Sequence, residues 1–328
     1  MAGTQHYDML RNVSRTFALS IEQLPVPLRD IVTVAYLLFR IADCIEDHAG
    51  LQPGRKAVLL RLWASVMQGR EDARGFMQEM SGLEPREDPE IDVARRADVV
   101  LDGLRALPQE PCEIVIRHVC DTSIGMARWQ EHGPFVEDEV AMDDYMHEVA
   151  GRVGYLLTEV FAWHDPVIAS RTGRLMQLGR EFGLALQTVN IIRGMRKDYE
   201  RGWVFVPRDL YEAHGLTRDS LFAPENQNRA MRVVAHLAGK AERHLRGGCT
   251  YISLLPAGSR RIRLFCIWPL LFAVKTLALS RNNPAVIASE AKITRPQVRR
   301  IVTVSSLIWW SNRLLGLYYR LLSVSRRV

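Results

Sequence analysis

Apolar residues recur with the period of an α-helix along most of this 328-residue chain. The clearest predicted helix runs from about residue 29 to 48, where Val32, Ala35, Leu38 and Ala42 supply apolar faces. Further helices are expected up to about residue 67 and over 91–106, 109–130, 142–161, 171–200, 224–254, 258–281 and 294–323. Period-two alternation never persists beyond about five residues. The pattern predicts an all-α protein.

Few stretches interrupt these helices. Residues 69–90 are polar, with Gly, Arg, Glu, Asp and Pro, and are expected to be a connection. Residues 202–207 read as an extended exit from the long helix before them. The middle of the chain has no Pro/Ser-rich linker, so one domain over residues 1–328 is expected.

One predicted helix has polar residues along a face that should be buried. Tyr36, Arg40, Asp43 and Asp47 fall at i, i+4, i+7 and i+11, which is a single stripe, and Glu46 lies beside it. Because the positions between them are apolar, the stripe is expected to face the interior.

A second helix repeats this arrangement. Gln187, Asn190, Gly194 and Asp198 fall at i, i+3, i+7 and i+11. Asn190 is too polar for a core helix unless it has a partner. The two polar faces are therefore expected to point at each other.

The acidic residues of the first stripe restrict its chemistry. Asp43, Glu46 and Asp47 cannot all stay ionised in a buried site without a counter-charge, whereas on a solvated face they would be harmless. The apolar residues around these three carboxylates favour a buried position for them. Mg²⁺ binds through one or two carboxylates, with water and phosphate oxygens completing its shell. A helical bundle with such a stripe suggests a diphosphate held by Mg²⁺ and a hydrocarbon tail in the core.

Composition and charge narrow the class further. The chain is 48% hydrophobic and 24% charged with a net charge of +6, as in a soluble globular protein that attracts anionic substrates or an anionic membrane surface. Basic blocks interleaved with aromatic residues are missing, so nucleic acid is not an expected partner. Five cysteines without a CxxC pair, and no secretory signal, indicate reduced thiols and a cytoplasmic location. The nine histidines form no zinc motif.

The C-terminal part of the chain is the most apolar. Proline or charged residues interrupt the segments 265–280 and 304–322, so neither offers the roughly 18 uninterrupted apolar residues of a membrane span. The last predicted helix has two tryptophans and two tyrosines among leucines, flanked by arginines, as an interfacial helix does. It is expected either to close the core or to make peripheral contact with a membrane.

Several motifs together resemble one known family. They are Ser14-Arg15-Thr16-Phe17; Tyr36, Arg40, Asp43, Glu46 and Asp47; Asp144-Tyr145 with His147, Gly151 and Gly154; Gln187, Asn190, Arg193 and Asp198; Gly202 with Pro207; and Phe265, Cys266 and Pro269. In this order they resemble the squalene/phytoene synthases, which join two prenyl diphosphates head to head. The resemblance spans residues 14 to about 300. Asn282-Asn283 and the stretch from Lys292 to Arg295 are more similar to the squalene-synthase branch.

The resemblance implies an isoprenoid-synthase helical bundle around a central apolar cavity. The protein is expected to be a monomer. It implies that two farnesyl diphosphates condense, with Mg²⁺, through presqualene diphosphate to squalene, and that NADPH serves the reductive step. The implied metal ligands are Asp43, Glu46, Asp47 and Asp198, and the implied catalytic residues are Tyr145, Tyr36 and Arg40. The implied substrate-binding residues are Arg15, Thr16, Phe17, Gln187, Asn190, Arg193 and Phe265. Lys292 and Arg295 match the cofactor region; no GxGxxG motif follows a strand, so NADPH rests on the resemblance alone.

The second acidic motif departs from the family pattern. Its first Asp is replaced by Gly194, Arg196 and Lys197 precede Asp198, and the usual Arg after Gly202 is Trp203. Either this site holds diphosphate with fewer metal ions, or the enzyme performs part of the reaction or takes another prenyl substrate. A presqualene diphosphate or hydroxysqualene-type synthase without hydride transfer, and an inactive helical binding protein, are the alternatives.

Overall fold

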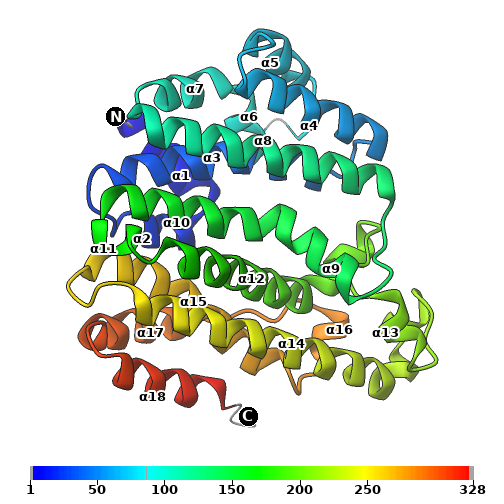
Figure 1. Cartoon of the computed structure of the whole chain (residues 1–328). Helices are drawn as coiled ribbons and strands as arrows, with labels where there is room; N and C mark the ends of the chain where they lie inside the picture. The colour runs from blue at the N-terminus through cyan, green and yellow to red at the C-terminus, as the bar shows by residue number, and fades with distance from the viewer. Residues whose placement is uncertain (1–2, 86, 325–328) are drawn as a thin grey trace. The chain divides into compact units, whose positions relative to one another are not determined.

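The chain is helical throughout the part that the structure describes. This structure is a computed structural model that describes residues 3–85 and 87–324, apart from the side chain of Arg15 (Figure 1). Within those ranges no β-strand forms, and a single isolated bridge joins Phe135 to Val204. The prediction of an all-α fold is confirmed. The central apolar cavity stays a prediction.

The helices follow one another with short connections. Their bounds are α1 (Thr4–Val13), α2 (Arg15–Ile21), α3 (Leu28–Asp47), α4 (Pro53–Met67), α5 (Ala73–Ser81), α6 (Pro89–Arg95), α7 (Ala97–Arg105), α8 (Gln109–His132), α9 (Glu139–Met146), η1 (His147–Gly151), α10 (Arg152–His164), α11 (Pro166–Ala169), α12 (Thr172–Glu200), α13 (Arg208–Glu212), η2 (Ser220–Phe222), η3 (Pro224–Asn226), α14 (Gln227–Leu254), α15 (Arg260–Ser280), α16 (Ala285–Ala288), α17 (Arg295–Ile308) and α18 (Asn312–Ser323).

Two compact units divide the chain. The first contains Met1–Gly133 and Tyr155–Thr172, and the second contains Pro134–Gly154 and Gly173–Val328. Each unit has its own helices and its own buried residues. The expectation of a single domain over residues 1–328 stays a prediction.

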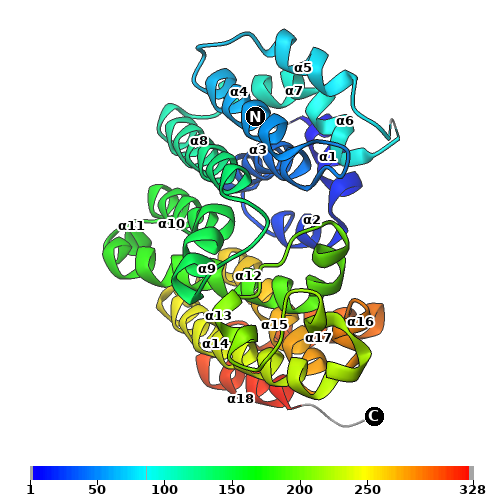
Figure 2. The ribbon, with the colours of Figure 1, turned by 90° about the vertical axis from the view of Figure 1, so that its right-hand side faces the viewer.

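Helix α3 is the centre of the first unit. It contacts α1, α4, α6, α7 and α8, while α4 and α8 run side by side (Figure 2). Buried Trp63 of α4 donates its indole N–H to the carbonyl oxygen of Leu38 at 3.3 Å and packs against Phe76 with ring centroids 4.9 Å apart. This packing fixes the rotation of α3, and with it the direction of the polar stripe.

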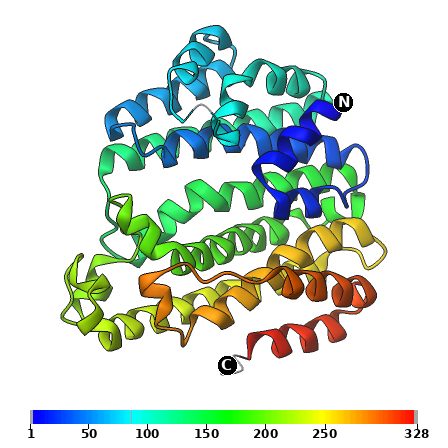
Figure 3. The same cartoon turned by 180° about the vertical axis from the view of Figure 1, so that it is seen from behind.

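The second unit is built on α12, α14 and α15. Helix α15 contacts α14, α17 and α18; in Figure 3 α14 is drawn in yellow, α17 in orange-red and α18 in red. Helix α12 packs closely on the start of helix α10. A Cβ placed on Gly154 would lie 2.0 Å from the carbonyl oxygen of Gly179. Glycine is therefore needed there for backbone contact.

One described helix, α15, is long and apolar enough to cross a membrane. Of its most apolar window, 83% is buried inside the structure, as in the core helix of a soluble protein, so length and composition are weak support for a span. Contrary to the expectation from the sequence, the proline and lysine within α15 do not exclude this helix as a candidate span by length and composition.

The long helices agree with the prediction from the sequence, whereas four segments differ from it. Residues 69–90 contain α5, which begins where the carboxylate of Asp72 accepts the N–H of Arg74 at 2.9 Å. The helix expected over 91–106 is divided at Arg96 into α6 and α7. The five-residue π-helix η1 interrupts the one expected over 142–161. The final helix breaks at Ser311, which caps α18.

Candidate functional site

Arg40 lies at the middle of the α3 stripe. Its Nη2 donates to the hydroxyl of Tyr36 at 2.8 Å, and its Nη1 lies 3.7 Å from Asp43 Oδ2 and 3.3 Å from Glu90 Oε1. Burial disfavours the charged guanidinium, but Asp43, Tyr36 and Glu90 outweigh burial and raise the pKa of Arg40. Arg40 is therefore a fixed positive charge.

Asp43 is held partly protonated near neutral pH. Burial raises the pKa of Asp43 to about 6; Arg40 opposes this, and the carboxylates of Asp47 and Glu90 add to it. Solvent still reaches 37% of its side chain. A carboxylate that is accessible and crowded by like charges is suited to bind a cation.

Glu90 is a member of this group that the sequence did not indicate. It lies on α6, fifty residues from Arg40, at the end of the stretch predicted to be a connection. The spacing of acidic residues on α3 contains no signal for it, because the contact depends on how α6 packs on α3.

Asp47 and Glu46 end helix α3. Asp47 is exposed and Glu46 half-buried, and the backbone carbonyl of Glu46 accepts a hydrogen bond from Lys56 Nζ at 2.5 Å. The stripe therefore runs from half-buried Tyr36 to exposed Asp47. The expectation that the stripe faces the interior is wrong for Asp47, because the last turn of α3 is open to solvent.

The Ser14–Phe17 motif begins helix α2. Ser14 is the N-cap, and its Oγ accepts the N–H of Phe17 at 3.2 Å. Thr16 and Phe17 are exposed, and the Phe17 ring lies 5.7 Å from the ring of Tyr36. The structure therefore brings Phe17 to the α3 stripe. Arg15 begins the same helix, and its side chain lies outside the described residues.

Helix α12 places its polar residues on a partly open face. Asn190 is exposed and donates from Nδ2 to Gln187 Oε1 at 3.4 Å, whereas Gln187 is half-buried. Gln187 is the partner that Asn190 was expected to need, and the expectation that this face points at the α3 stripe stays a prediction. A Cβ on Gly194 would meet only Asp198 Oδ2, at 3.7 Å. The helix packing does not require glycine at position 194.

Asp198 has a cation closer to it than Asp43 has. Arg201 Nη2 lies 2.5 Å from Asp198 Oδ1, and the Asp198 side chain is 14% exposed. Arg196 pairs with Glu200 at 2.8 Å, and Lys197 is exposed. Positive charge therefore predominates at this end of α12.

Tyr145 is buried in an aromatic stack of the second unit. Its ring lies 4.4 Å from that of Phe205 at an angle of 16°, and Phe205 lies 5.3 Å from Trp203. Trp203 thus replaces the usual arginine by extending this stack. The sequence did not indicate either partner.

The π-helix η1 begins two residues after Tyr145. Such single-turn insertions occur often at functional sites. Arg180 Nε donates to His147 Nδ1 at 3.3 Å, and burial together with the Arg180 and Arg152 charges lowers the pKa of His147. His147 is therefore a neutral imidazole near neutral pH.

The remaining predicted residues lie on α12, on α15, in the connection before α17 and at the start of α17. Phe265 is buried in α15. Lys292 is exposed and its Nζ lies 2.6 Å from Glu290 Oε2; Glu290 Oε1 lies 3.2 Å from Arg193 Nε. Arg295 is exposed at the start of α17. Glu290 links Arg193 to Lys292, and the sequence analysis did not identify it.

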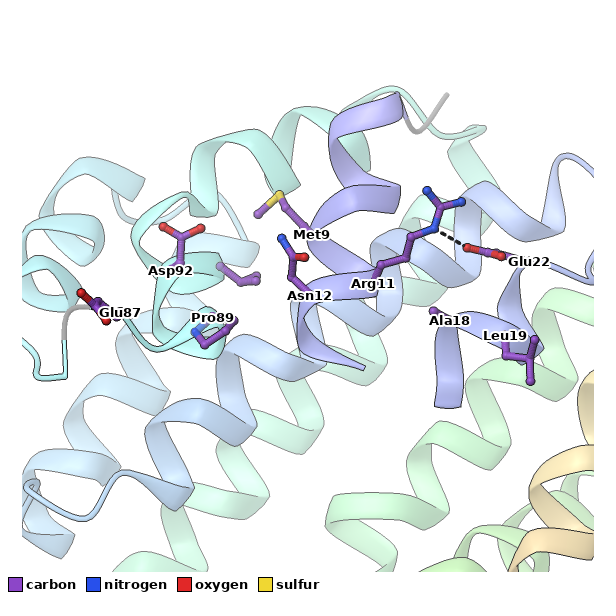
Figure 4. A pocket seen from close by; sticks show the side chains of 10 residues that line it. Met9, Arg11, Asn12, Ala18, Leu19, Glu22, Glu87, Pro89 and Asp92 are labelled. Atoms are coloured by element: carbon purple, nitrogen blue, oxygen red, sulfur yellow. Dashed lines mark hydrogen bonds and ion pairs between the residues drawn. The ribbon is translucent and has the colours of Figure 1, made fainter. Parts of the chain in front are cut away.

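A pocket among the described residues lies elsewhere. It has a volume of about 780 Å³ and is lined by α1, α2 and the start of α6, with Arg11 Nε donating to Glu22 Oε1 at 2.7 Å (Figure 4). None of the predicted site residues lines it.

Metal binding by the protein alone has no support in the described residues. No group of three or more His, Cys, Asp and Glu side chains there could hold a metal ion. Mg²⁺ usually needs only one or two carboxylates when a substrate phosphate supplies the other oxygens. The pair Asp43 and Asp47 fits that arrangement.

Comparison with known proteins gives consistent relatives. A family model described as squalene/phytoene synthase matches residues 10–301. The chain is 29% identical over 304 residues to the squalene synthase of Schizosaccharomyces pombe, covering 90% of this chain and 63% of that protein. It is also 29% identical over 295 residues to the squalene synthase of Homo sapiens, covering 89% and 66%.

A solved structure has the same fold. TcSQS in complex with the ligand BPH1237 superposes with a TM-score of 0.85 and 25% sequence identity over 99% of this chain and 92% of that chain. The chain spans about two thirds of the length of the two curated relatives. The match over residues 10–301 shows that the chain belongs to the squalene/phytoene synthase family.

Proposed function

We propose that the protein condenses two farnesyl diphosphates head to head, through presqualene diphosphate, to squalene. The observation that supports this most is the α3 stripe, where Arg40 is fixed between Asp43 and Glu90 and the pKa of Asp43 is raised to about 6. Family membership supports the reaction class.

Magnesium fits the chemistry of the α3 stripe. Asp43 and Asp47 are one turn apart on the open end of the helix, and the charge of Asp47 raises the pKa of Asp43. A bound cation would remove this repulsion. Mg²⁺ bound there would neutralise the negative charge of the diphosphate that leaves the allylic carbon.

Arg40 and Tyr36 would hold that diphosphate in place. Arg40 has donors on a planar fork that matches phosphate oxygens, and its position is set by Tyr36 and Glu90. Because the pKa of Arg40 is raised, the guanidinium stays charged throughout turnover.

Tyr145 is the proposed proton-transfer residue. The double bond of the second farnesyl group attacks the allylic cation, and loss of one proton closes the cyclopropane. Stacking on Phe205 holds the Tyr145 ring in one orientation, as proton transfer requires. One diphosphate and one proton leave in this half of the reaction.

At the end of α12, side-chain cations are proposed to bind diphosphate with fewer metal ions. Gly194 removes one carboxylate, Asp198 is neutralised by Arg201, and Lys197 is exposed. Lys197 would contact phosphate oxygens directly, because its exposed ammonium is a point charge on a flexible stem that can reach an anion.

The reductive half uses NADPH in this proposal. A hydride from NADPH would be delivered as the second diphosphate leaves, and Lys292 and Arg295 would hold the cofactor phosphates. Both are exposed and basic, but Glu290 lies 2.6 Å from Lys292 and would repel a phosphate there. That carboxylate favours the second candidate, a synthase that stops before hydride transfer.

Diphosphate release tests the proposed function. Wild-type protein with farnesyl diphosphate and Mg²⁺ should release diphosphate, and chelation of Mg²⁺ should stop it. Asp43→Asn should reduce the rate by at least about a hundredfold, whereas Asp102→Asn, an exposed position of the same unit, should not change it. No release under any metal condition would instead support an inactive helical protein.

A further inference from the structure

A buried lysine connects helix α14 to helix α9 in the second unit. Lys240 of α14 is 4% exposed. Its Nζ donates to Glu139 Oε2 at 3.0 Å and lies 2.8 Å from Asp143 Oδ1. Both carboxylates belong to α9 and are one turn apart. His236, one turn before Lys240, adds a contact of 2.5 Å between its Nε2 and Glu139 Oε1. Two side chains of α14 therefore hold one face of α9.

Tyr145 lies on the opposite face of the same helix. It follows Asp143 by two residues, which turns its side chain by about 200° around the helix axis. The ring of Tyr145 stacks on Phe205 at 4.4 Å. The segment of Phe205 is itself tied to the residues before α9, because the N–H of Val204 donates to the carbonyl oxygen of Pro134 at 3.1 Å. Helix α9 is thus held on both sides, by α14 and by this aromatic stack.

The chain that follows Tyr145 does not continue α9 as a regular helix. The π-helix η1 begins two residues after Tyr145 and changes the hydrogen-bond spacing between α9 and α10. The rotation of α9 about its own axis is therefore not set by one unbroken ladder of hydrogen bonds. It is set by the contacts on its sides, and the Lys240 contacts are the charged ones among them.

Stability alone does not account for a buried lysine at this position. The desolvation of buried charges offsets most of their attraction, and apolar side chains of similar volume are often as stable in their place. Buried charged and polar groups can instead fix one register between helices, because any other arrangement leaves a charge without a partner. A rotated α9 would leave Lys240 buried and unpaired, so the lysine selects one orientation of this helix.

We propose that Lys240 is a positioning residue for proton transfer by Tyr145, an inference that rests on the proposed function. By fixing the rotation of α9, Lys240 holds the Tyr145 hydroxyl where the C30 cation loses its proton and the cyclopropane closes. When Tyr145 is out of place, this proton loss slows and the attack of the second double bond reverses. Water then captures the allylic cation: one C–O bond forms, the water gives up one proton, and a C15 alcohol results.

The share of consumed farnesyl diphosphate that appears as C15 alcohol, with Mg²⁺ and without NADPH, tests this role. A product share does not depend on how much of a variant is folded, so a purely structural role would leave it unchanged. Lys240→Met/Glu139→Gln/Asp143→Asn removes all three charges together and should fold, because no buried charge is left unpaired. We expect this neutral variant to raise the C15 share by at least about tenfold. Lys240→Arg retains the charge and should lie between the neutral variant and wild type.

Glu242→Gln is the matched control. Glu242 lies two residues after Lys240 on α14 and pairs with Arg281, so its loss removes an ion pair of the same helix that does not involve α9. The C15 share should stay at the wild-type value. An unchanged share in the neutral variant, or an equal rise in Glu242→Gln, would overturn the role of Lys240 even though C30 products still form. Wild-type protein that makes no C30 product would overturn the proposed function, and this inference with it.

Discussion

Arg40 Nη1 lies 3.3 Å from Glu90 Oε1, which joins helix α3 to helix α6 across fifty residues of sequence. The same nitrogen lies 3.7 Å from Asp43 Oδ2. Two carboxylates therefore share one guanidinium. The negative charge of Glu90 also raises the pKa of Asp43, so Glu90 both fixes the arginine and tunes the proposed metal ligand.

Removing the charge of Glu90 should shift the pH profile. Asp43 has a pKa of about 6, so Mg²⁺-dependent turnover should fall as the pH drops through about 6 and the carboxylate becomes protonated. Glu90→Gln removes a like charge and lowers the pKa of Asp43. The acid limb should move down by about half a pH unit. Glu87→Gln, an exposed neighbour, is the control, and an acid limb that stays in place or moves up would contradict this role.

Asp43→Asn should stabilise the protein while inactivating it. A carboxyl whose pKa is raised on folding stabilises the fold below its unfolded pKa, and this contribution is lost as the pH rises through about 6. The neutral asparagine does not incur this loss. At pH 8 without Mg²⁺ we expect a gain of about 1 kcal/mol, or about 2 °C in Tm, a figure reduced because the side chain is 37% exposed.

The gain should shrink at pH 5, where Asp43 is mostly protonated in the wild type. Thermal unfolding at both pH values measures the difference. A variant that is less stable than wild type at pH 8 would show that Asp43 is not under electrostatic strain.

Gly194→Asp tests the altered second motif. A Cβ at position 194 meets only Asp198 Oδ2 at 3.7 Å, so the variant should fold. The new carboxylate lies one turn from Asp198 and should strengthen Mg²⁺ dependence, lowering the Mg²⁺ concentration for half-maximal turnover by about tenfold. Gly194→Asn has the same size without the charge and should behave as wild type. An unchanged Mg²⁺ requirement in both variants would count against a reduced metal site.

Gly154→Ala should destabilise the second unit strongly. Its Cβ would lie 2.0 Å from the carbonyl oxygen and 2.5 Å from the carbonyl carbon of Gly179, and backbone atoms cannot yield as a flexible side chain does. A loss of about 3 kcal/mol or more is expected in urea unfolding. Gly316→Ala on α18 meets nothing within 4 Å and should raise stability by about 0.5 kcal/mol. Comparable stabilities for the two variants would contradict this close packing.

Periodicity revealed the long helices and the stripe from Tyr36 to Asp47, because these depend on spacing within one helix. It could not reveal Glu90, Phe205 or Glu290, whose contacts with predicted residues depend on tertiary packing. The break before α18 was also missed; buried Arg263 holds this turn through Trp309 and Asn312, and these contacts depend on tertiary packing.

Exposure was the other property that the sequence misjudged. The α3 stripe was expected to face the interior, yet Asp47 at its end is exposed. The site residues on both units were identified from the resemblance to the family, which does not depend on burial. Their roles in Mg²⁺ and NADPH chemistry stay predictions.

The most direct test of the proposed reaction is the product formed from farnesyl diphosphate and Mg²⁺ with and without NADPH. We expect squalene when NADPH is present and presqualene diphosphate when it is withheld. A hydroxylated or unreduced C30 product that is the same with and without NADPH would contradict hydride transfer. Unchanged farnesyl diphosphate under every metal condition would contradict the condensation itself.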